Sequence, residues 1–115
     1  MNTVIFDVLE PGMLRRDVGQ AFRADAVQVP RISFASPELL FKVLGGRRWE
    51  LLQAMSGAGA LGIREAARRV GRDVRAVHAD IQILLREGVI DRTEDGKVEF
   101  PYDAVHVDFT IGRAA

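Results

Sequence analysis

Apolar residues recur along the chain at intervals that predict an alternation of strands and helices. Thr3 to Leu9 is short and largely apolar, which predicts a strand. Val27 to Ala35 is rich in β-branched and aromatic residues and predicts a second strand, with Pro30 marking an edge. Between them, apolar residues at three- and four-residue steps predict a helix with one apolar stripe, formed by Met13, Leu14, Val18, Ala21 and Phe22.

Capping residues and glycines divide the next part of the chain into helices. Ser36 and Pro37 favour a helix start, and this helix is expected to run through Leu44. Gly45-Gly46 ends it. A second helix is predicted from Arg47 to Ser56, with a buried side made of Trp49, Leu51, Leu52 and Met55.

Two further helices are predicted close together. Arg64 to Val70 gives a helix of about two turns, which Gly71 closes. Asp73 is expected to cap a longer helix that runs to Glu87. Its core-facing stripe is predicted to contain Val74, Val77, Ile81, Leu84 and Leu85.

The end of the chain predicts a hairpin and one more strand. Val89 to Asp91 and Lys97 to Phe100 flank a tight turn at Glu94-Asp95-Gly96. Ala104 to Ile111 alternates apolar and polar residues, so it predicts a half-buried strand. We expect this strand to lie beside Val29 to Ala35.

This order of elements is typical of a known DNA-binding fold. Helix, short helix, glycine turn, long helix and hairpin is the arrangement of a winged helix-turn-helix. The predicted fold class is α+β: a winged helix-turn-helix with an N-terminal strand-helix extension and a C-terminal β-strand. We expect residues 1–35 to form the extension, for dimerisation or partner binding, and residues 36–111 to form the DNA-binding domain with the last strand.

Two stretches of the chain carry a resemblance to a protein family. Residues 61–81, LGIREAARRVGRDVRAVHADI, and residues 84–92, LLREGVIDR, resemble small prokaryotic winged helix-turn-helix transcriptional regulators of the MarR/ArsR-like type. Within these, the chain is similar to an antitoxin-like subset of type II toxin-antitoxin systems. The resemblance implies operator binding, often autoregulatory, with a toxin as partner.

The charges are balanced overall but unevenly distributed. The chain has 16 basic and 16 acidic residues. Residues 36–88 hold nine basic against six acidic groups, and residues 89–115 hold three against six. Fourteen of the basic residues are Arg, which suits bidentate contacts with phosphate or guanine. A GC-rich genome would give the same arginine and alanine content.

The candidate DNA contacts lie on the last two helices and the hairpin. They are Arg64, Arg68, Arg69, Arg72, Arg75, Ala76, Ala79, Gln82 and Lys97. At the start of a recognition helix, arginines reach phosphates or guanine edges and alanines can meet a thymine methyl. Arg64, Arg68 and Arg69 fit phosphate contacts or a plain solvated face equally well. Lys97 and Arg92 flank the wing, where the acidic turn weakens a DNA contact.

Other residues with chemical potential have ordinary structural explanations. His78 falls at the margin of the core stripe and is expected to be structural. His106 lies on the polar face of the last strand, and Trp49 is expected in the core. The acidic residues after residue 90 form either a solvated surface or a docking face for a basic partner.

Several function classes are not expected. The chain has no cysteine and two separated histidines, so neither a metal site nor a cysteine nucleophile is expected. Gly45-Gly46 and Gly57-Ala58-Gly59 lie between predicted helices rather than after a strand, so they are hinges rather than phosphate loops. No catalytic residue, enzyme activity or cofactor is predicted. The N-terminus lacks the pattern of a signal peptide and no stretch suits a membrane span, which predicts a cytoplasmic protein without a membrane partner.

The sequence therefore predicts a repressor that binds double-stranded DNA, as a homodimer and with a possible toxin partner. A two-fold pair of recognition helices would read both halves of a palindrome. The alternative is a winged helix that serves as a protein-interaction module or adaptor without binding DNA. The neutral net charge favours the alternative, and the arginines of residues 64–75 favour DNA.

Overall fold

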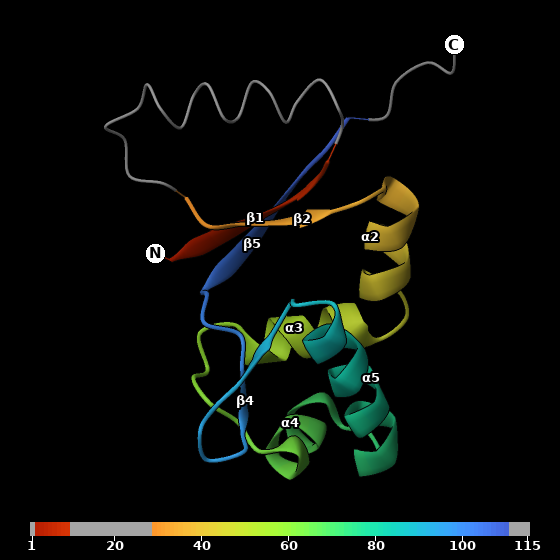
Figure 1. Cartoon of the computed structure of the whole chain (residues 1–115). Coiled ribbons are helices and arrows are strands. Elements are labelled where there is room, and N and C mark those ends of the chain that lie inside the picture. The colour runs from red at the N-terminus through yellow and green to blue at the C-terminus, as the bar shows by residue number, and fades with distance from the viewer. Residues whose placement is uncertain (1, 10–28, 111–115) are drawn as a thin grey trace.

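A computed structural model describes residues 2–9 and 29–110 as a mixed α+β fold (Figure 1). The predicted helix with Met13 to Phe22 and the end of the predicted last strand at Ile111 lie outside these residues. The described elements are β1 (Thr3–Val8), β2 (Arg31–Phe34), α2 (Pro37–Leu44), α3 (Arg48–Met55), α4 (Ile63–Val70), α5 (Val74–Arg86), β3 (Asp91–Arg92), β4 (Val98–Glu99) and β5 (Ala104–Asp108).

The first, second and last of these strands form a three-stranded sheet in the order β2-β1-β5. β1 is parallel to both neighbours, with Phe6 opposite Ile32 on one side and Val107 on the other. The expected pairing of the second strand with the last strand is therefore wrong, because β1 lies between them. Val4, Phe6, Asp7 and Val8 are all buried, which is the burial pattern of a central strand covered on both faces.

The helices begin and end where local signals place them. The Ser36 hydroxyl accepts a hydrogen bond from the Leu39 N–H at 3.1 Å and caps α2. The Asp73 carboxylate accepts from the N–H groups of Arg75 and Ala76 and caps α5. Gly71 ends α4 with φ 65°, in the left-handed region that favours glycine. The predicted four helices are confirmed, each within one or two residues of its expected ends.

The predicted hairpin is also confirmed, and it reaches back to an earlier segment. β3 and β4 pair antiparallel, with Arg92 opposite Val98. Leu61, which precedes α4, exchanges two backbone hydrogen bonds with Val98, at 2.8 and 2.9 Å. Leu61 therefore adds a third strand position, one residue long, to the hairpin.

One continuous core joins the sheet to the helices and the hairpin. In Figure 1 the three-stranded sheet lies at one end, α4 and the hairpin lie at the other, and α3 lies between them. The Phe6 ring meets the rings of Phe34 and Phe100 edge to face, at centroid distances of 5.7 and 6.3 Å. Phe100 directly follows β4, so Phe6 packs the sheet against the hairpin side of the molecule.

Two predicted core residues, Trp49 and Val74, and one residue of the predicted half-buried strand, Val107, are more exposed than expected. Trp49 is 38% exposed and Val74 is 40% exposed. Along α3 the buried residues are Leu51, Leu52 and Met55, and Trp49 lies roughly 115° away from the centre of that stripe. Val107 of β5 is 37% exposed because β5 is an edge strand of the sheet.

The helices of the described ranges include none that is both long and apolar enough to cross a bilayer.

Candidate nucleic-acid interface

The tight connection between α4 and α5 forms the centre of the candidate site. Gly71, Arg72 and Asp73 are the whole connection. The Arg72 N–H donates to the Ala67 carbonyl at 3.0 Å, which closes the end of α4. Ala66 and Ala67 are buried, and their small side chains let α4 approach its neighbours closely. The two helices are thereby held as one unit.

Four of the predicted contacts are exposed arginines of this helix pair: Arg64, Arg68, Arg69 and Arg75. Glu65 forms ion pairs with Arg68 and with Arg69, the latter at 3.1 Å. Hydrogen bonds from Arg68 first and Arg69 second lower the pKa of the Glu65 carboxyl below its ordinary value, so it is ionised at neutral pH. Within residues 2–9 and 29–110, Arg64 and Arg75 form no ion pair. Four of the predicted arginines are thus exposed on α4 and α5, and two of them, Arg68 and Arg69, form ion pairs with the same carboxylate.

The exposed face of α5 continues from Arg75. Ala79 and Gln82 are exposed at steps of four and three residues, and Ala76 is half-buried beside them. His78 is also exposed, and its Nε2 lies 3.5 Å from the Gln82 amide nitrogen. The expected position of His78 at the margin of the core is therefore wrong. Its i, i+4 spacing from Gln82 was the signal that placed it on the outer face.

Arg72 lies in a different environment from the other predicted contacts. Its Nη1 donates to the Asp80 carboxylate at 2.8 Å, and its side chain is only 12% exposed. A DNA contact at the start of α5 requires an exposed Arg72 side chain, and this expectation is wrong. Arg72 lies in the turn before the helix, so its side chain folds back along α5 to reach Asp80, two turns further along.

Asp80 and Arg48 complete a largely buried ionic cluster that the sequence pattern did not predict. The Arg48 Nη1 donates to Asp80 at 3.1 Å, and the side chains of Arg48 and Asp80 are 19% and 13% exposed. Arg48 also donates from Nε to the Val43 carbonyl at 2.5 Å and from Nη2 to the Lys42 carbonyl at 2.6 Å. The cluster therefore ties the end of α2, the start of α3 and the turn before α5 to the middle of α5.

A signal for this cluster was present in the sequence. Asp80 falls between Val77, Ile81 and Leu84, all buried, so it lies on the core side of the helix. A carboxylate in such a stripe requires a charged partner. The sequence does not indicate which residues pair with Asp80, because Arg48 lies 32 positions away along the chain.

The hairpin tip carries charges of both signs. Lys97 is exposed and its Nζ lies 4.0 Å from the Asp95 carboxylate. A hydrogen bond from the Thr93 hydroxyl is the main cause that lowers the pKa of the Asp95 carboxyl. Glu94 is exposed beside it. The predicted contact Lys97 thus faces a negative neighbour.

In the described parts of the chain, no group of three or more His, Cys, Asp or Glu side chains is arranged to hold a metal ion.

Fold and site together define a small α+β protein in which the α4–α5 unit carries exposed arginines and is followed along the chain by a hairpin. A family model gives the relationship. The HVO_A0114 family matches residues 43–107, more than half of the chain, so the chain belongs to this family. The match runs from the end of α2 into β5 and includes the helix pair, the ionic cluster and the hairpin. A comparison with curated proteins gives no match.

Proposed function

We propose that this protein is a winged helix-turn-helix regulator that binds double-stranded DNA through α4 and α5. The observation that carries the proposal is the linked set of α4, a three-residue turn, α5 and a hairpin hydrogen-bonded to Leu61. In a winged helix-turn-helix the second helix of the pair lies in the major groove. Here that helix is α5, and its outer face is free of large apolar side chains from Arg75 to Gln82.

The side chains on α5 suit base and backbone contacts. Arg75, in the first turn, can donate two hydrogen bonds to guanine or to a phosphate. Gln82 can pair with adenine, and Ala79 allows close approach and a methyl contact with thymine. Arg64, Arg68 and Arg69 on α4 would lie along the phosphate backbone, where they would fix the position of the protein rather than read sequence.

The buried ionic cluster supports the same function in two ways. It holds α5 against α3 and α2, which keeps the recognition helix rigid when it enters the groove. Its two guanidinium groups and one carboxylate also leave a formal charge of +1 under the α4–α5 turn, from Arg48, Arg72 and Asp80. Arg72 thus contributes by position and charge rather than by direct contact with DNA.

The hairpin is expected to contribute less to DNA binding than the helices. Glu94 and Asp95 at its tip would repel phosphates, and Asp95 lies close to Lys97. Arg92 and Lys97 remain the only basic side chains of the segment from Asp91 to Phe100. Binding is therefore concentrated on the helix pair, and the wing adds backbone contacts at most.

The test is DNA binding by the full chain, measured with a duplex from the region upstream of its own gene. Arg75→Ala should weaken specific binding about tenfold, because a bidentate arginine contact contributes roughly 1–3 kcal/mol. Arg86→Ala is the matched control: it removes the same charge from the same helix, 11 positions away and roughly 16 Å along its axis. Affinity should fall as salt rises.

Two outcomes would contradict the proposal. If the native protein fails to bind the duplex even at low salt, the fold serves as a protein-interaction module instead. If Arg75→Ala and Arg86→Ala weaken binding equally, the contact is nonspecific and α5 is not the recognition helix. No described residue singles out a surface for a toxin, so we do not extend the proposal to a toxin-antitoxin role.

A further inference from the structure

The outer edge of β5 has no strand partner among the described residues. Within residues 2–9 and 29–110, β5 pairs on one side with β1 and on the other side with no strand. The Ala104 N–H donates to the Asn2 carbonyl, so Ala104, His106 and Asp108 direct their backbone groups toward β1. Backbone direction alternates along a strand. Val105, Val107 and Phe109 therefore direct theirs outward, to the free edge.

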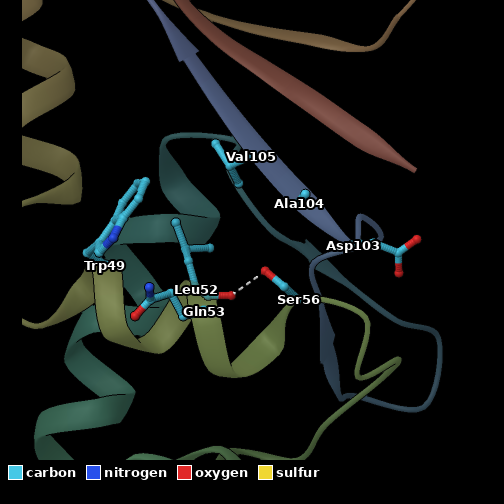
Figure 2. Close-up of a pocket in the computed structure, with 7 residues that line it drawn as sticks. All are labelled: Trp49, Leu52, Gln53, Ser56, Asp103, Ala104 and Val105. Atoms are coloured by element: carbon cyan, nitrogen blue, oxygen red, sulfur yellow. Dashed lines mark hydrogen bonds between the residues drawn. The ribbon is translucent and has the colours of Figure 1, made fainter. Parts of the chain in front are cut away.

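Next to this edge lies an exposed apolar surface. Phe41 of α2 is 57% exposed, and its ring meets Phe109 edge to face at 5.5 Å. A hollow of about 250 Å³ lies between Phe41, Trp49 and Val107. A second hollow of about 290 Å³ lies on the other side of Trp49 (Figure 2), where Val105 points toward Leu52 and Asp103 points away. Exposed apolar surface beside an open strand edge is typical of an interaction site.

We propose that a second copy of this chain binds at this edge, with the two β5 strands antiparallel and Val107 of each copy opposite Val107 of the other. The two sheets would join into one six-stranded sheet with a two-fold axis at Val107. The partner strand would also cover the apolar surface formed by Phe41, Trp49 and Val107. This interface is independent of the DNA-binding proposal, because it can be measured without DNA.

The sequence of β5 is complementary to itself in this register. Val105 would lie opposite Phe109 of the second copy, on the face that carries Phe41 and Trp49. His106 would lie opposite Asp108 of the second copy, on the other face, and the two-fold axis repeats this pair. An imidazole N–H can donate to the carboxylate, and facing residues in antiparallel strands interact directly.

Other registers lose this complementarity. A shift of the axis by half a residue would place apolar residues opposite polar ones on the wrong faces. An axis at His106 would place the two histidines opposite each other and Asp108 opposite Ala104. An axis at Asp108 would place two carboxylates opposite each other, which is destabilising.

Within the described ranges 2–9 and 29–110, Asp108 has no cationic partner in its own copy. It lies in register with Asp7 of β1. Asp7 is paired with Arg31 at 2.7 Å and accepts a hydrogen bond from the Ser33 hydroxyl. No ion pair is formed by Asp108 in the part of the chain that the structure describes. His106 of the second copy would supply the missing donor.

The first test uses single cysteines, since the chain has none of its own. In the proposed register the Cα atoms of residue 107 in the two copies would be about 5.5 Å apart, within the range for a disulfide. Val107→Cys should therefore give a cross-linked dimer on mild oxidation. Val105→Cys should not, because the two positions would be more than about 13 Å apart along the strands.

The second test exchanges the charged pair in the full chain. His106→Asp places two carboxylates opposite each other twice across the axis, so the dimer dissociation constant should rise about tenfold. Adding Asp108→Lys to the same chain restores opposite charges and should return the constant to near the native value. Analytical ultracentrifugation measures these constants, and circular dichroism verifies that each variant is folded.

Each other outcome overturns the inference. A native protein that is monomeric at concentrations up to about 100 times those of the DNA-binding assay excludes this dimer, even if DNA binding is observed. Cross-linking through His106→Cys rather than Val107→Cys excludes the register. A dimer that survives His106→Asp unchanged forms at another surface.

Discussion

The charged residues of this protein fall into two groups: some form ion pairs inside the fold, and others are exposed to solvent. Asp80 accepts from two arginines and is 9% exposed as a residue. Burying a charge is costly unless it is paired and hydrogen-bonded. Here all three members are engaged, since Arg48 uses its other N–H groups on the carbonyls of Val43 and Lys42. The described residues have no buried side-chain nitrogen or oxygen without a hydrogen-bond partner.

Asp80→Asn should destabilise the protein by about 3 kcal/mol. The change leaves Arg48 and Arg72 close together with no compensating charge, which for buried pairs costs about 3–5 kcal/mol. Partial exposure of the two arginines favours the lower end of that range. Chemical denaturation measures the loss. Asp91→Asn, on the exposed strand β3, is the control and should change stability by less than about 0.5 kcal/mol; an equal loss in both variants would contradict a specific role for the cluster.

At the scale of helices and strands, local signals gave the elements but not their partners. Ser36, Asp73 and Gly71 are caps whose effect is confined to neighbouring residues, so the helix ends were predictable. The hairpin was predictable from its turn for the same reason. The central position of β1 was not, because it depends on how segments about 100 residues apart meet, as Asp103 does with Asn2.

The candidate site divides in the same way. The exposed positions Arg75, Ala79 and Gln82 followed from helix periodicity alone. The environment of Arg72 did not follow from periodicity, because Arg72 precedes the helix and its side chain turns toward Asp80. Trp49 was misplaced because its apolar character was weighed above its angle on α3. Helix periodicity predicts exposure poorly for long side chains and for residues at helix ends.

The turn between α4 and α5 depends on the backbone of Gly71. Gly71→Ala should cost about 1 kcal/mol, since a left-handed conformation disfavours a Cβ by about 1–2 kcal/mol and the stiffer unfolded chain offsets part of it. Gly71→Asn should cost less, because asparagine tolerates this conformation. Thermal unfolding measures both. If the asparagine variant proves the less stable of the two, backbone conformation is not what requires glycine in this turn.

In the described part of the molecule, strands from near the two ends of the chain pair with each other. β1 begins at residue 3 and β5 ends at residue 108, yet the two strands lie side by side in one sheet. α2 packs on β2 and faces Phe109, and α3 connects this end to α4 and α5 (Figure 1). A dimer formed through β5 would therefore fix the position of the proposed recognition helices through one packed core rather than through a linker.

Phe6 is the side chain that best tests whether the sheet and the helical part unfold as one unit. It is fully buried and meets Phe34 in the sheet and Phe100 after the hairpin. Phe6→Ala should lower the free energy of unfolding by about 3–5 kcal/mol, through lost burial and the cavity that remains. Phe6→Leu keeps most of the apolar volume and should cost less. Phe6→Ala should still unfold in one step, because the core is continuous.

Two signals report on this transition: the fluorescence of Trp49, the one tryptophan of the chain, and the circular dichroism of the helices. Both should change together. Two separated transitions would mean that the sheet and the α4–α5 unit are stable independently, and β5 and α5 would then not belong to one cooperative unit.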